Sequence, residues 1–367
     1  MRALLTAIGL SCLMAPASPA LAGTTYTGDK IDGAPVISQL AVNDLACGAK
    51  YRFWFQGADN AIGQHEYLPV LVAKGCDAGP RLGLQSALHG DELNGTRSIQ
   101  MVFDGIDVKT LKGAVIGAIG VNPTGMLASN RNYQEESDGG SYEDPNRVWP
   151  GKEHGSAAEV HIWKLWNKLW GGNVDLFIDM HTQSRGTAYP LFVYADVRNP
   201  KVLAMARLIP ADQIKMDPGQ HGSAETTFDE NQIPAITMEI GSAKLYQWPY
   251  IDKSVIGVRN VMIANGMQPG KLGMTAAQAH TYWGNDMTSV RATVGGFAQI
   301  LVKLDQDVHK GERIALQRNP FGDVIQQYLA PVDGRVLSIG NDPLREPGAL
   351  LVRILSQNPS AACKQGC

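Results

Sequence analysis

From about residue 50 to residue 265, short apolar runs alternate with segments of helical periodicity. The run "LKGAVIGAIGVNP" is almost continuously apolar, which is typical of a strand that is buried on both faces of a sheet, and we also interpret "VDLFIDMHTQS" as a buried strand. The segment "AAEVHIWKLWNKLWGG" instead repeats its apolar residues at helical spacing and ends at two glycines. This alternation predicts an α/β fold with a mixed, mostly parallel sheet that is flanked by helices.

The helical periodicity disappears after about residue 285. Short β runs with glycine turns follow, such as "APVDGRVLSI" and "PGALLVRIL", and they predict a small all-β domain. The last residues form a polar tail. We therefore divide the chain into a leader (1–22), a catalytic α/β domain (23–285), a C-terminal β domain (286–357) and a tail (358–367).

The leader has the three parts of a secretory signal peptide, namely Arg2, a short apolar stretch and the small-x-small sequence Ala20-Leu21-Ala22. The apolar stretch is too short to span a bilayer, and no later segment has the pattern of a membrane span. A lipoprotein signal is the alternative, but the residues before Cys12 match a lipobox poorly. We expect cleavage after Ala22 and a mature protein that is periplasmic or secreted.

Export to an oxidising compartment would leave four cysteines in the mature chain. We expect the pairs that are nearest in sequence, Cys47–Cys76 and Cys363–Cys367, with free thiols as the alternative. The first pair would close a loop of about 30 residues and stabilise the fold by about 3 kcal/mol. Because no CxxC spacing occurs, a cysteine zinc site is not expected.

The stretch "SALHGDELNG" places His89 and Glu92 three residues apart, where a predicted strand gives way to a helix. His181 ends another buried strand, and the carboxyl ends of parallel strands meet at one edge of a sheet. Two histidines and a glutamate are a common ligand set for hydrolytic zinc. We predict one zinc ion per chain, although similar ligands bind other divalent metals and a histidine at a strand end is often an ordinary hydrogen-bonded group.

Further polar residues lie near these three. Glu239 ends the buried strand "PAITMEIG", where poor solvation would raise its pKa and suit a general base; a structural carboxylate that caps the next helix is the alternative. Residues 124–156 are polar and glycine-rich, and we expect a long irregular loop. It supplies Arg131, Asn146 and Arg147. One guanidinium could polarise a carbonyl, and another, with Asn146, could hold a carboxylate.

In this order, HGDE, NP followed after seven residues by Arg131, DPNR, DMHTQS and TMEIG resemble the succinylglutamate desuccinylase/aspartoacylase family of the zinc carboxypeptidase clan. The resemblance covers roughly residues 65–357 and includes the family's C-terminal barrel-sandwich module. It implies His89, Glu92 and His181 as zinc ligands. It also implies a catalytic base, a carbonyl-polarising arginine and a carboxylate anchor, which are Glu239, Arg131 and the pair Asn146 and Arg147.

The chain departs from the family pattern in places. Pro145 stands where the family often has leucine, the insertion "QEESDGGSYE" is acidic, and the better-known members are cytoplasmic. We find no clear match for a tyrosine from the C-terminal module and take Tyr328 as the candidate. His221, in a glycine-rich segment before the Glu239 strand, is a candidate substrate contact.

These observations predict an exported zinc-dependent amidohydrolase that cleaves an amide next to a carboxylate, with an N-acyl amino acid as substrate. The alternative is a zinc carboxypeptidase or peptidase that acts on short or peptidoglycan-derived peptides. A non-catalytic binding protein is a third hypothesis, but such a protein would be expected to lose a ligand or the base. The formal net charge of −3 argues against a nucleic-acid partner, and a homo-oligomer is left open.

Overall fold

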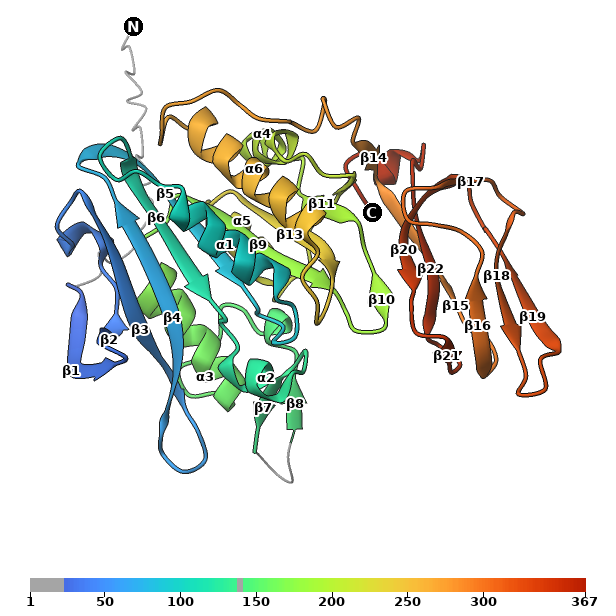
Figure 1. Cartoon of the computed structure of the whole chain (residues 1–367), viewed down its shortest axis with the longest axis horizontal. Coiled ribbons are helices and arrows are strands. Elements are labelled where there is room, and N and C mark those ends of the chain that lie inside the picture. Colours follow the sequence, from blue (N-terminus) through green and yellow to red (C-terminus); the bar gives the residue numbers. More distant parts are fainter. Residues whose placement is uncertain (1–22, 137–140) are drawn as a thin grey trace, which may run out of the picture.

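The computed structural model describes residues 23–136 and 141–367, so the predicted signal peptide lies outside the described residues. Its main layer is an 11-stranded sheet (Figure 1). In sheet order the strands are β1 (Thr25–Ile31), β2 (Ala34–Gln39), β3 (Ala49–Asp59), β4 (His65–Lys74), β6 (Lys112–Ile119), β5 (Asp77–Ser86), β9 (Leu176–Gln183), β13 (Ala235–Ser242), β11 (Leu191–Ala195), β12 (Gln213–Met216) and β14 (Tyr282–Gly284).

The middle of this sheet is parallel. β6, β5, β9 and β13 run side by side in the same direction, whereas β11 is antiparallel to β13 and β4 is antiparallel to both β3 and β6. The mixed, mostly parallel sheet that the sequence predicts is therefore confirmed. Its consequence for function is that β5, β9 and β13 bring their carboxyl ends to the same edge.

Helices cover both faces of the sheet (Figure 1). One face packs against α1 (Asn94–Asp104), α4 (Pro200–Leu208) and α6 (Trp248–Ala264). The other face packs against α3 (Ala157–Lys164), which continues as a π-helical turn (Leu165–Trp170), and against α5 (Ala224–Glu230). Successive residues of β9 point to opposite faces of the sheet: Ile178 packs in the core under α1, α4 and α6, and Phe177 packs in the core under α3 and α5.

The prediction of a long irregular loop at residues 124–156 is wrong. The segment contains α2 (Pro123–Ala128), the hairpin of β7 (Tyr133–Glu135) and β8 (Ser141–Glu143), and a 3-10 turn (Pro145–Arg147). Helix α2 begins at Asn122, whose side chain accepts a hydrogen bond from the Gly125 amide. These short elements satisfy backbone groups locally, so the segment has a defined shape without helical or strand periodicity.

The C-terminal part is all-β, as predicted, and consists of two small sheets (Figure 1). One contains β10 (Thr187–Ala188), β20 (Gly334–Gly340), β22 (Leu350–Ser356), β15 (Asp286–Arg291) and β17 (Asp307–Val308), and the other contains β19 (Val324–Leu329), β18 (Arg313–Arg318), β16 (Gly296–Ile300) and β21 (Leu344–Arg345). Because β10 precedes this region in sequence yet pairs with β20, the α/β part contributes to a C-terminal sheet. The exact division into domains stays a prediction.

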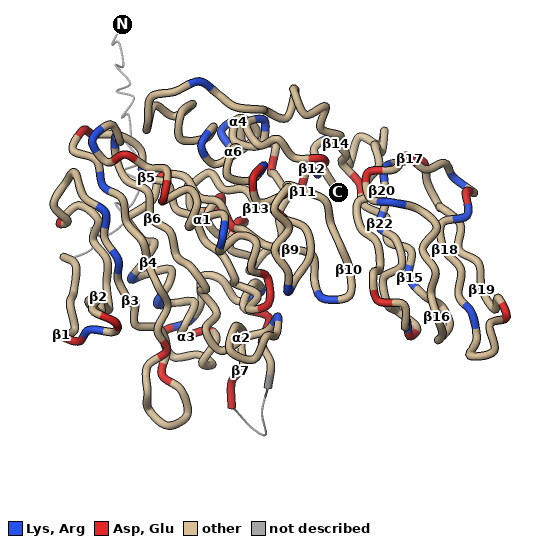
Figure 2. The backbone as a smooth tube through the Cα atoms, in the orientation of Figure 1, with Lys and Arg blue, Asp and Glu red and all other residues tan. Residues whose placement is uncertain are grey.

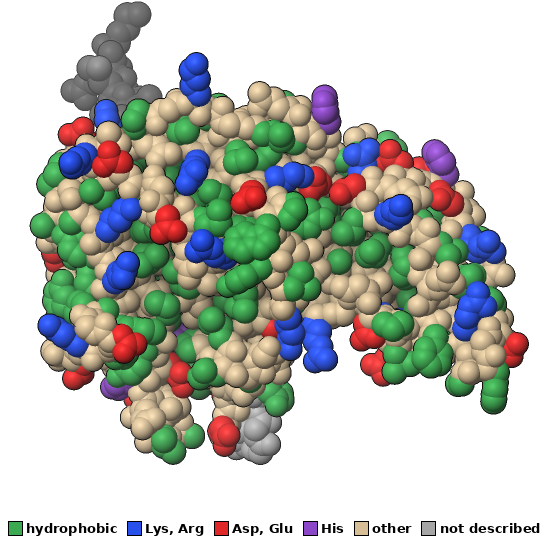
Figure 3. All heavy atoms as spheres, viewed as in Figure 1, with side chains coloured by type: hydrophobic (Ala, Val, Ile, Leu, Met, Phe, Trp, Pro, Cys, Tyr) green, Lys and Arg blue, Asp and Glu red, His purple; other side chains and the backbone are tan. Residues whose placement is uncertain are grey.

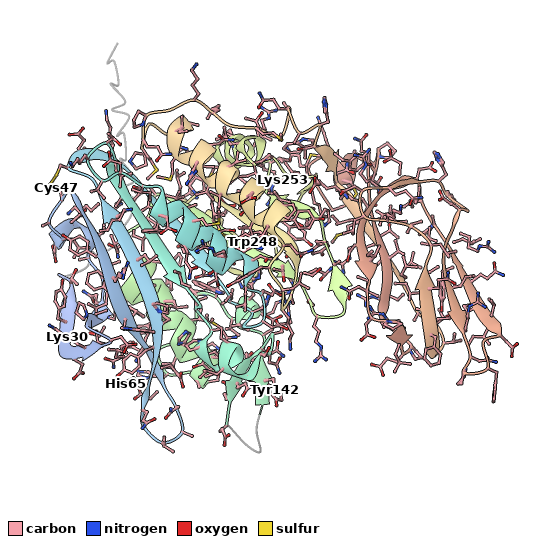
Figure 4. All side chains as sticks on the ribbon, in the orientation of Figure 1. Lys30, Cys47, His65, Tyr142, Trp248 and Lys253 are labelled. Carbon is pink, nitrogen blue, oxygen red and sulfur yellow. A yellow bond between two sulfur atoms is a disulfide. The ribbon has the colours of Figure 1, made fainter. Side chains whose placement is uncertain are left out.

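Both predicted disulfides are present, Cys47–Cys76 and Cys363–Cys367. Cys47 lies at one end of the first strands of the large sheet (Figure 4), where the bond ties the segment before β3 to the end of β4. Among the described residues, no helix is long and apolar enough to cross a membrane.

Charges of both signs are interspersed along the chain in the view of Figure 2, which agrees with the formal net charge of −3. Figure 3 shows the molecular surface hollowed between the region of α2 to β8 and the C-terminal sheets. That the protein does not bind nucleic acid stays a prediction.

Candidate metal-dependent active site

His89, Glu92 and His181 come together at the carboxyl edge of the sheet, as the strand order requires. His89 and Glu92 lie in the turn from β5 to α1, and His181 lies on β9. The Nδ1 atoms of the two histidines are 3.0 Å apart, and the Glu92 Oε2 atom is 2.9 Å from His181 Nδ1. All three residues are buried, and their ligand atoms lie within 4.8 Å of one another. Two imidazole nitrogens and a carboxylate oxygen therefore face one point.

The outer nitrogen of each histidine is held by a carboxylate. His89 Nε2 donates to Asp144 Oδ1 at 3.1 Å, and His181 Nε2 donates to Asp179 Oδ2 at 2.9 Å. Such partners orient the ring and leave the other nitrogen free to bind a metal. Asp144 was not singled out from the sequence, although it is the first residue of the quoted DPNR motif.

The turn that carries His89 depends on a glycine. A Cβ atom on Gly90 would come within 2.1 Å of the Gly125 backbone in α2. Only glycine permits this close approach of two backbone segments. The same approach brings Arg131 near, because the Gly90 amide donates to the Arg131 carbonyl oxygen at 3.2 Å.

The Glu92 carboxylate is fully buried. It accepts hydrogen bonds from the Thr182 amide at 3.0 Å and from Arg131 Nη1 at 3.1 Å. Burial alone would raise the pKa of Glu92, but the adjacent His89 and His181 more than offset this and hold the pKa well below its ordinary value. Glu92 is therefore an anion, which is the form that a metal ligand needs.

Glu239 lies beside His181 on the neighbouring strand. In the parallel pair of β13 and β9, Glu239 is in register with His181. Its Oε2 atom is buried and has no hydrogen-bond partner in the described part of the chain. Burial raises the pKa of Glu239 to about 8, against the opposing effects of His181 and Arg131. A carboxyl group with such a pKa, facing a cavity, is suited to accept and release a proton near neutral pH.

Arg131, Asn146 and Arg147 line the same cavity as His89, His181 and Glu239, and its volume is about 360 Å³. Besides Glu92, Arg131 donates to Ser184 Oγ at 3.1 Å. The amide group of Asn146 is fixed by α5, because the Ala224 amide donates to Asn146 Oδ1 at 2.8 Å. All the residues of the sequence-predicted catalytic core are thus gathered at one site.

The remaining cavity wall comes from residues that the sequence analysis did not single out, some of them inside the quoted motifs. Two of them, Met287 and Arg353, belong to the C-terminal β15 and β22. Arg353 Nη1 donates to the Tyr189 hydroxyl at 2.5 Å, so a C-terminal strand reaches the site. The other lining residues that the sequence analysis missed include Gln183, Ser184, Tyr189, Tyr194, Gln220, Ser223, Glu225 and Thr237.

The structure does not bring two of the predicted substrate contacts, His221 and Tyr328, to the cavity. The His221 side chain is 89% exposed and does not line the cavity, and its ion-pair partner is Glu230 at 3.8 Å. Tyr328 is only 5% exposed and lies in the hydrophobic core of the C-terminal sheets. Its hydroxyl donates to Gln317 Oε1 and accepts from the Thr293 amide at 2.9 Å. Because these bonds lie inside the C-terminal part, Tyr328 supports that core.

Comparisons with known proteins agree with this geometry. Residues 78–264 match the family model of the succinylglutamate desuccinylase/aspartoacylase catalytic domain. No curated protein matches the chain. Several solved structures share the fold.

The product-bound structure of the ectoine utilization protein EutE (DoeB) from Ruegeria pomeroyi is 19% identical, with a TM-score of 0.74, and the match covers 85% of this chain and 97% of that one. A succinylglutamate desuccinylase/aspartoacylase from Rhodobacter sphaeroides is 18% identical, with a TM-score of 0.74 over 88% of this chain and 100% of that one. At such identities the structural likeness establishes the fold, whereas the family match rests on the sequence. The chain belongs to the succinylglutamate desuccinylase/aspartoacylase family of amide-hydrolysing deacylases.

Proposed function

We propose that the protein is an exported zinc-dependent amidohydrolase that removes the acyl group from an N-acyl amino acid. The observation that supports this most is the placement of His89, Glu92 and His181 around one point, with the unpartnered Glu239 carboxyl on the adjacent strand. Buried carboxyl groups with a purely structural role are normally hydrogen-bonded, so the unpartnered Glu239 carboxyl beside these residues favours a functional site. Export is supported by the predicted signal peptide and is compatible with the two disulfides.

His89 Nδ1, His181 Nδ1 and a Glu92 carboxylate oxygen would hold the metal. Two histidines and one glutamate are a donor set that zinc prefers in hydrolases, and the carboxylates behind both histidines strengthen the fit. A bound zinc ion supplies Lewis acidity, which polarises a carbonyl group and lowers the pKa of water.

The protein's own residues perform the proton transfers and hold the substrate. Glu239 takes a proton from the attacking water and delivers it to the nitrogen of the leaving amine as the amide bond breaks. Arg131 offers its guanidinium to the oxygen of the scissile carbonyl, where negative charge develops. Asn146 and Arg147 bind the carboxylate next to the amide, which sets the distance from that carboxylate to the bond that is cleaved.

A zinc carboxypeptidase or peptidase is the second candidate. The predicted signal peptide favours it, because cell-wall peptides occur in the compartment to which the protein would be exported. The same residues would act on the same kind of bond, so only the substrate distinguishes the two candidates.

The test is metal analysis of the purified mature protein beside the variant His89→Ala/Glu92→Ala, with hydrolysis followed on N-acyl amino acids and peptidoglycan stem peptides. We expect one zinc per chain in the wild type and loss of both metal and activity in the variant. The control His221→Ala/Glu230→Ala removes an exposed histidine and glutamate and should keep both. A folded wild type that binds no metal, and gains no activity on addition of zinc, would refute the proposal.

A further inference from the structure

We propose that the cavity contains a specificity site for a basic side chain, centred on Glu225, and that the preferred substrates release an amino acid whose side chain ends in a primary ammonium group. This inference rests on the proposed function, because it assigns the substrate class of the same site. It concerns the wall of the cavity away from the metal-binding residues.

Glu225 is a buried carboxyl group that faces the cavity. It lies in the first turn of α5, is only 7% exposed and lines the cavity that contains His181 and Glu239. Its Oε2 atom accepts a hydrogen bond from the Thr237 hydroxyl at 2.7 Å. Thr237 is two residues before Glu239 on β13, so their side chains point to the same face of the sheet. Glu225 is therefore anchored to the strand that carries the proposed base.

Within the described residues, Glu225 forms no ion pair with a lysine, arginine or histidine. Lys215 pairs with Asp217, because its Nζ atom lies 2.8 Å from Asp217 Oδ2. Burial, and then the negative charges of Asp217, Asp229 and Asp179, raise the pKa of Glu225 well above its ordinary value. Buried carboxylates are ordinarily paired with a cation or neutralised. A cationic ligand would complete the pair and favour the ionised form of Glu225.

Glu225 lines the same cavity as the proposed carboxylate anchor, Asn146 and Arg147. The Ala224 amide donates to Asn146 Oδ1, so the residue before Glu225 contacts the proposed anchor directly. The α5 segment also packs on Arg147, since a Cβ atom on Gly222 would lie 2.4 Å from the Arg147 carbonyl oxygen. A leaving amino acid whose α-carboxylate binds Asn146 and Arg147 can thus direct its side chain towards Glu225.

Arg353 also lines the cavity, and its positive charge would instead favour a substrate with an acidic side chain. Arg353 already donates to Tyr189 and to Ser289 Oγ, the latter at 3.1 Å. Glu225 has a single described hydrogen bond and no counter-ion. We therefore favour the basic side chain, because a ligand ammonium group would give the Glu225 carboxyl the counter-ion that the described residues do not supply.

The experiment compares three substrates of the zinc-loaded enzyme: Nα-acetyl-L-lysine, Nα-acetyl-L-norleucine and Nα-acetyl-L-glutamate. Norleucine has the carbon chain of lysine without the ammonium group. We expect kcat/KM for the lysine substrate to exceed that for norleucine by about 10- to 100-fold, the range that corresponds to one charge-assisted hydrogen bond. Glu225→Gln, which keeps the acceptor for Thr237, should lower this ratio to about 1.

The matched control is Glu230→Gln on the same helix, whose side chain is 54% exposed, and it should retain the wild-type ratio. Calorimetric titration with L-lysine and L-norleucine provides a readout that needs no turnover. Preferential binding of L-lysine, lost in Glu225→Gln, would support the specificity site even if no substrate were hydrolysed, and the proposed function would then fail alone. If Glu225→Gln does not fold, Glu225→Asp should show a reduced ratio.

Equal hydrolysis of the lysine and norleucine substrates, or a preference for glutamate, would overturn the inference and leave the proposed function standing. So would a Glu225→Gln enzyme that folds and keeps the wild-type ratio.

Discussion

Acid should destabilise the fold through His161, a buried histidine on α3. Its ring is fully buried and joins two backbone segments, because Nδ1 accepts from the Ala58 amide at 3.3 Å and Nε2 donates to the Val121 carbonyl oxygen at 2.7 Å. Both bonds require the neutral ring protonated at Nε2. Burial lowers the pKa of His161 from its ordinary value of 6.5 to about 4.

Acid lowers the stability because the unfolded chain binds a proton at His161 more readily than the folded protein does. Between pH 6.5 and 4 the unfolded chain carries a proton at His161 that the folded protein does not, so the free energy of unfolding falls as the pH falls. With these two pKa values, the loss at pH 4.5 relative to pH 8 is about 2.5 kcal/mol. Below pH 4 the loss becomes constant, since both states are then protonated at His161.

Other groups titrate in the same pH range, so the test compares the free energy of unfolding of the wild type with that of a variant without His161. Burial raises the pKa of Asp229 to about 7, for example, and this acts in the opposite direction. Urea unfolding of the wild type and of His161→Gln, measured by tryptophan fluorescence at pH 8 and pH 4.5 with a chelator, cancels these shared contributions. Glutamine keeps a donor and an acceptor but does not titrate.

We expect the stability advantage of the wild type over His161→Gln to shrink by about 2.5 kcal/mol between pH 8 and pH 4.5. An advantage that is equal at the two pH values, within about 0.5 kcal/mol, would refute the reasoning. It would mean that the ring is protonated in the folded protein or exposed to water.

Three further predictions follow from the site and its support. Glu239→Gln should lower kcat by about 10²- to 10⁴-fold with zinc content unchanged, and a variant that retains wild-type kcat would exclude Glu239 as the base. Replacing Cys47 and Cys76 by alanine should reduce the free energy of unfolding by about 3–4 kcal/mol, given the sequence separation of 29 residues, and chemical denaturation measures this loss. Tyr328→Phe should cost about 1–2 kcal/mol of stability through its lost hydrogen bonds and leave kcat/KM unchanged; a large fall in kcat/KM of the folded variant would return Tyr328 to the active site.

The grouping of His89, Glu92 and His181 could be predicted from the sequence because strand topology determines where they lie. His181 follows the short apolar stretch Leu176–Ile178 and lies on β9, every residue of which is buried. Parallel neighbours with such runs expose their ends at one edge, so a polar residue at the end of each run meets the others. The same reasoning placed Glu239 beside His181, and the register of β13 with β9 agrees with it. The disulfides were predictable because nearby cysteines need little chain closure.

The second layer of the site could not be derived in this way. Asp179 precedes His181 by two residues and therefore shares its face of the strand, a relation that periodicity alone could have revealed. Asp144 lies 55 residues from His89 in a segment without periodicity, and its contact depends on the fold of α2 and the β7–β8 hairpin. Short elements held by local side-chain hydrogen bonds have little apolar patterning, so a pattern of hydrophobic residues does not detect them.

The composition of the segment before β13 did not indicate which of its residues faces the cavity. His221 was a candidate because it lies in this glycine-rich segment, but Gly222 packs against Arg147 and the His221 side chain is exposed to solvent. The residue that faces the cavity is Glu225, three positions after Gly222, where α5 has begun. In a short helix the direction of each side chain changes by about 100° per residue. The composition of a loop identifies the segment that borders a site, whereas the contacts at the start of the helix decide which of its residues lines the cavity.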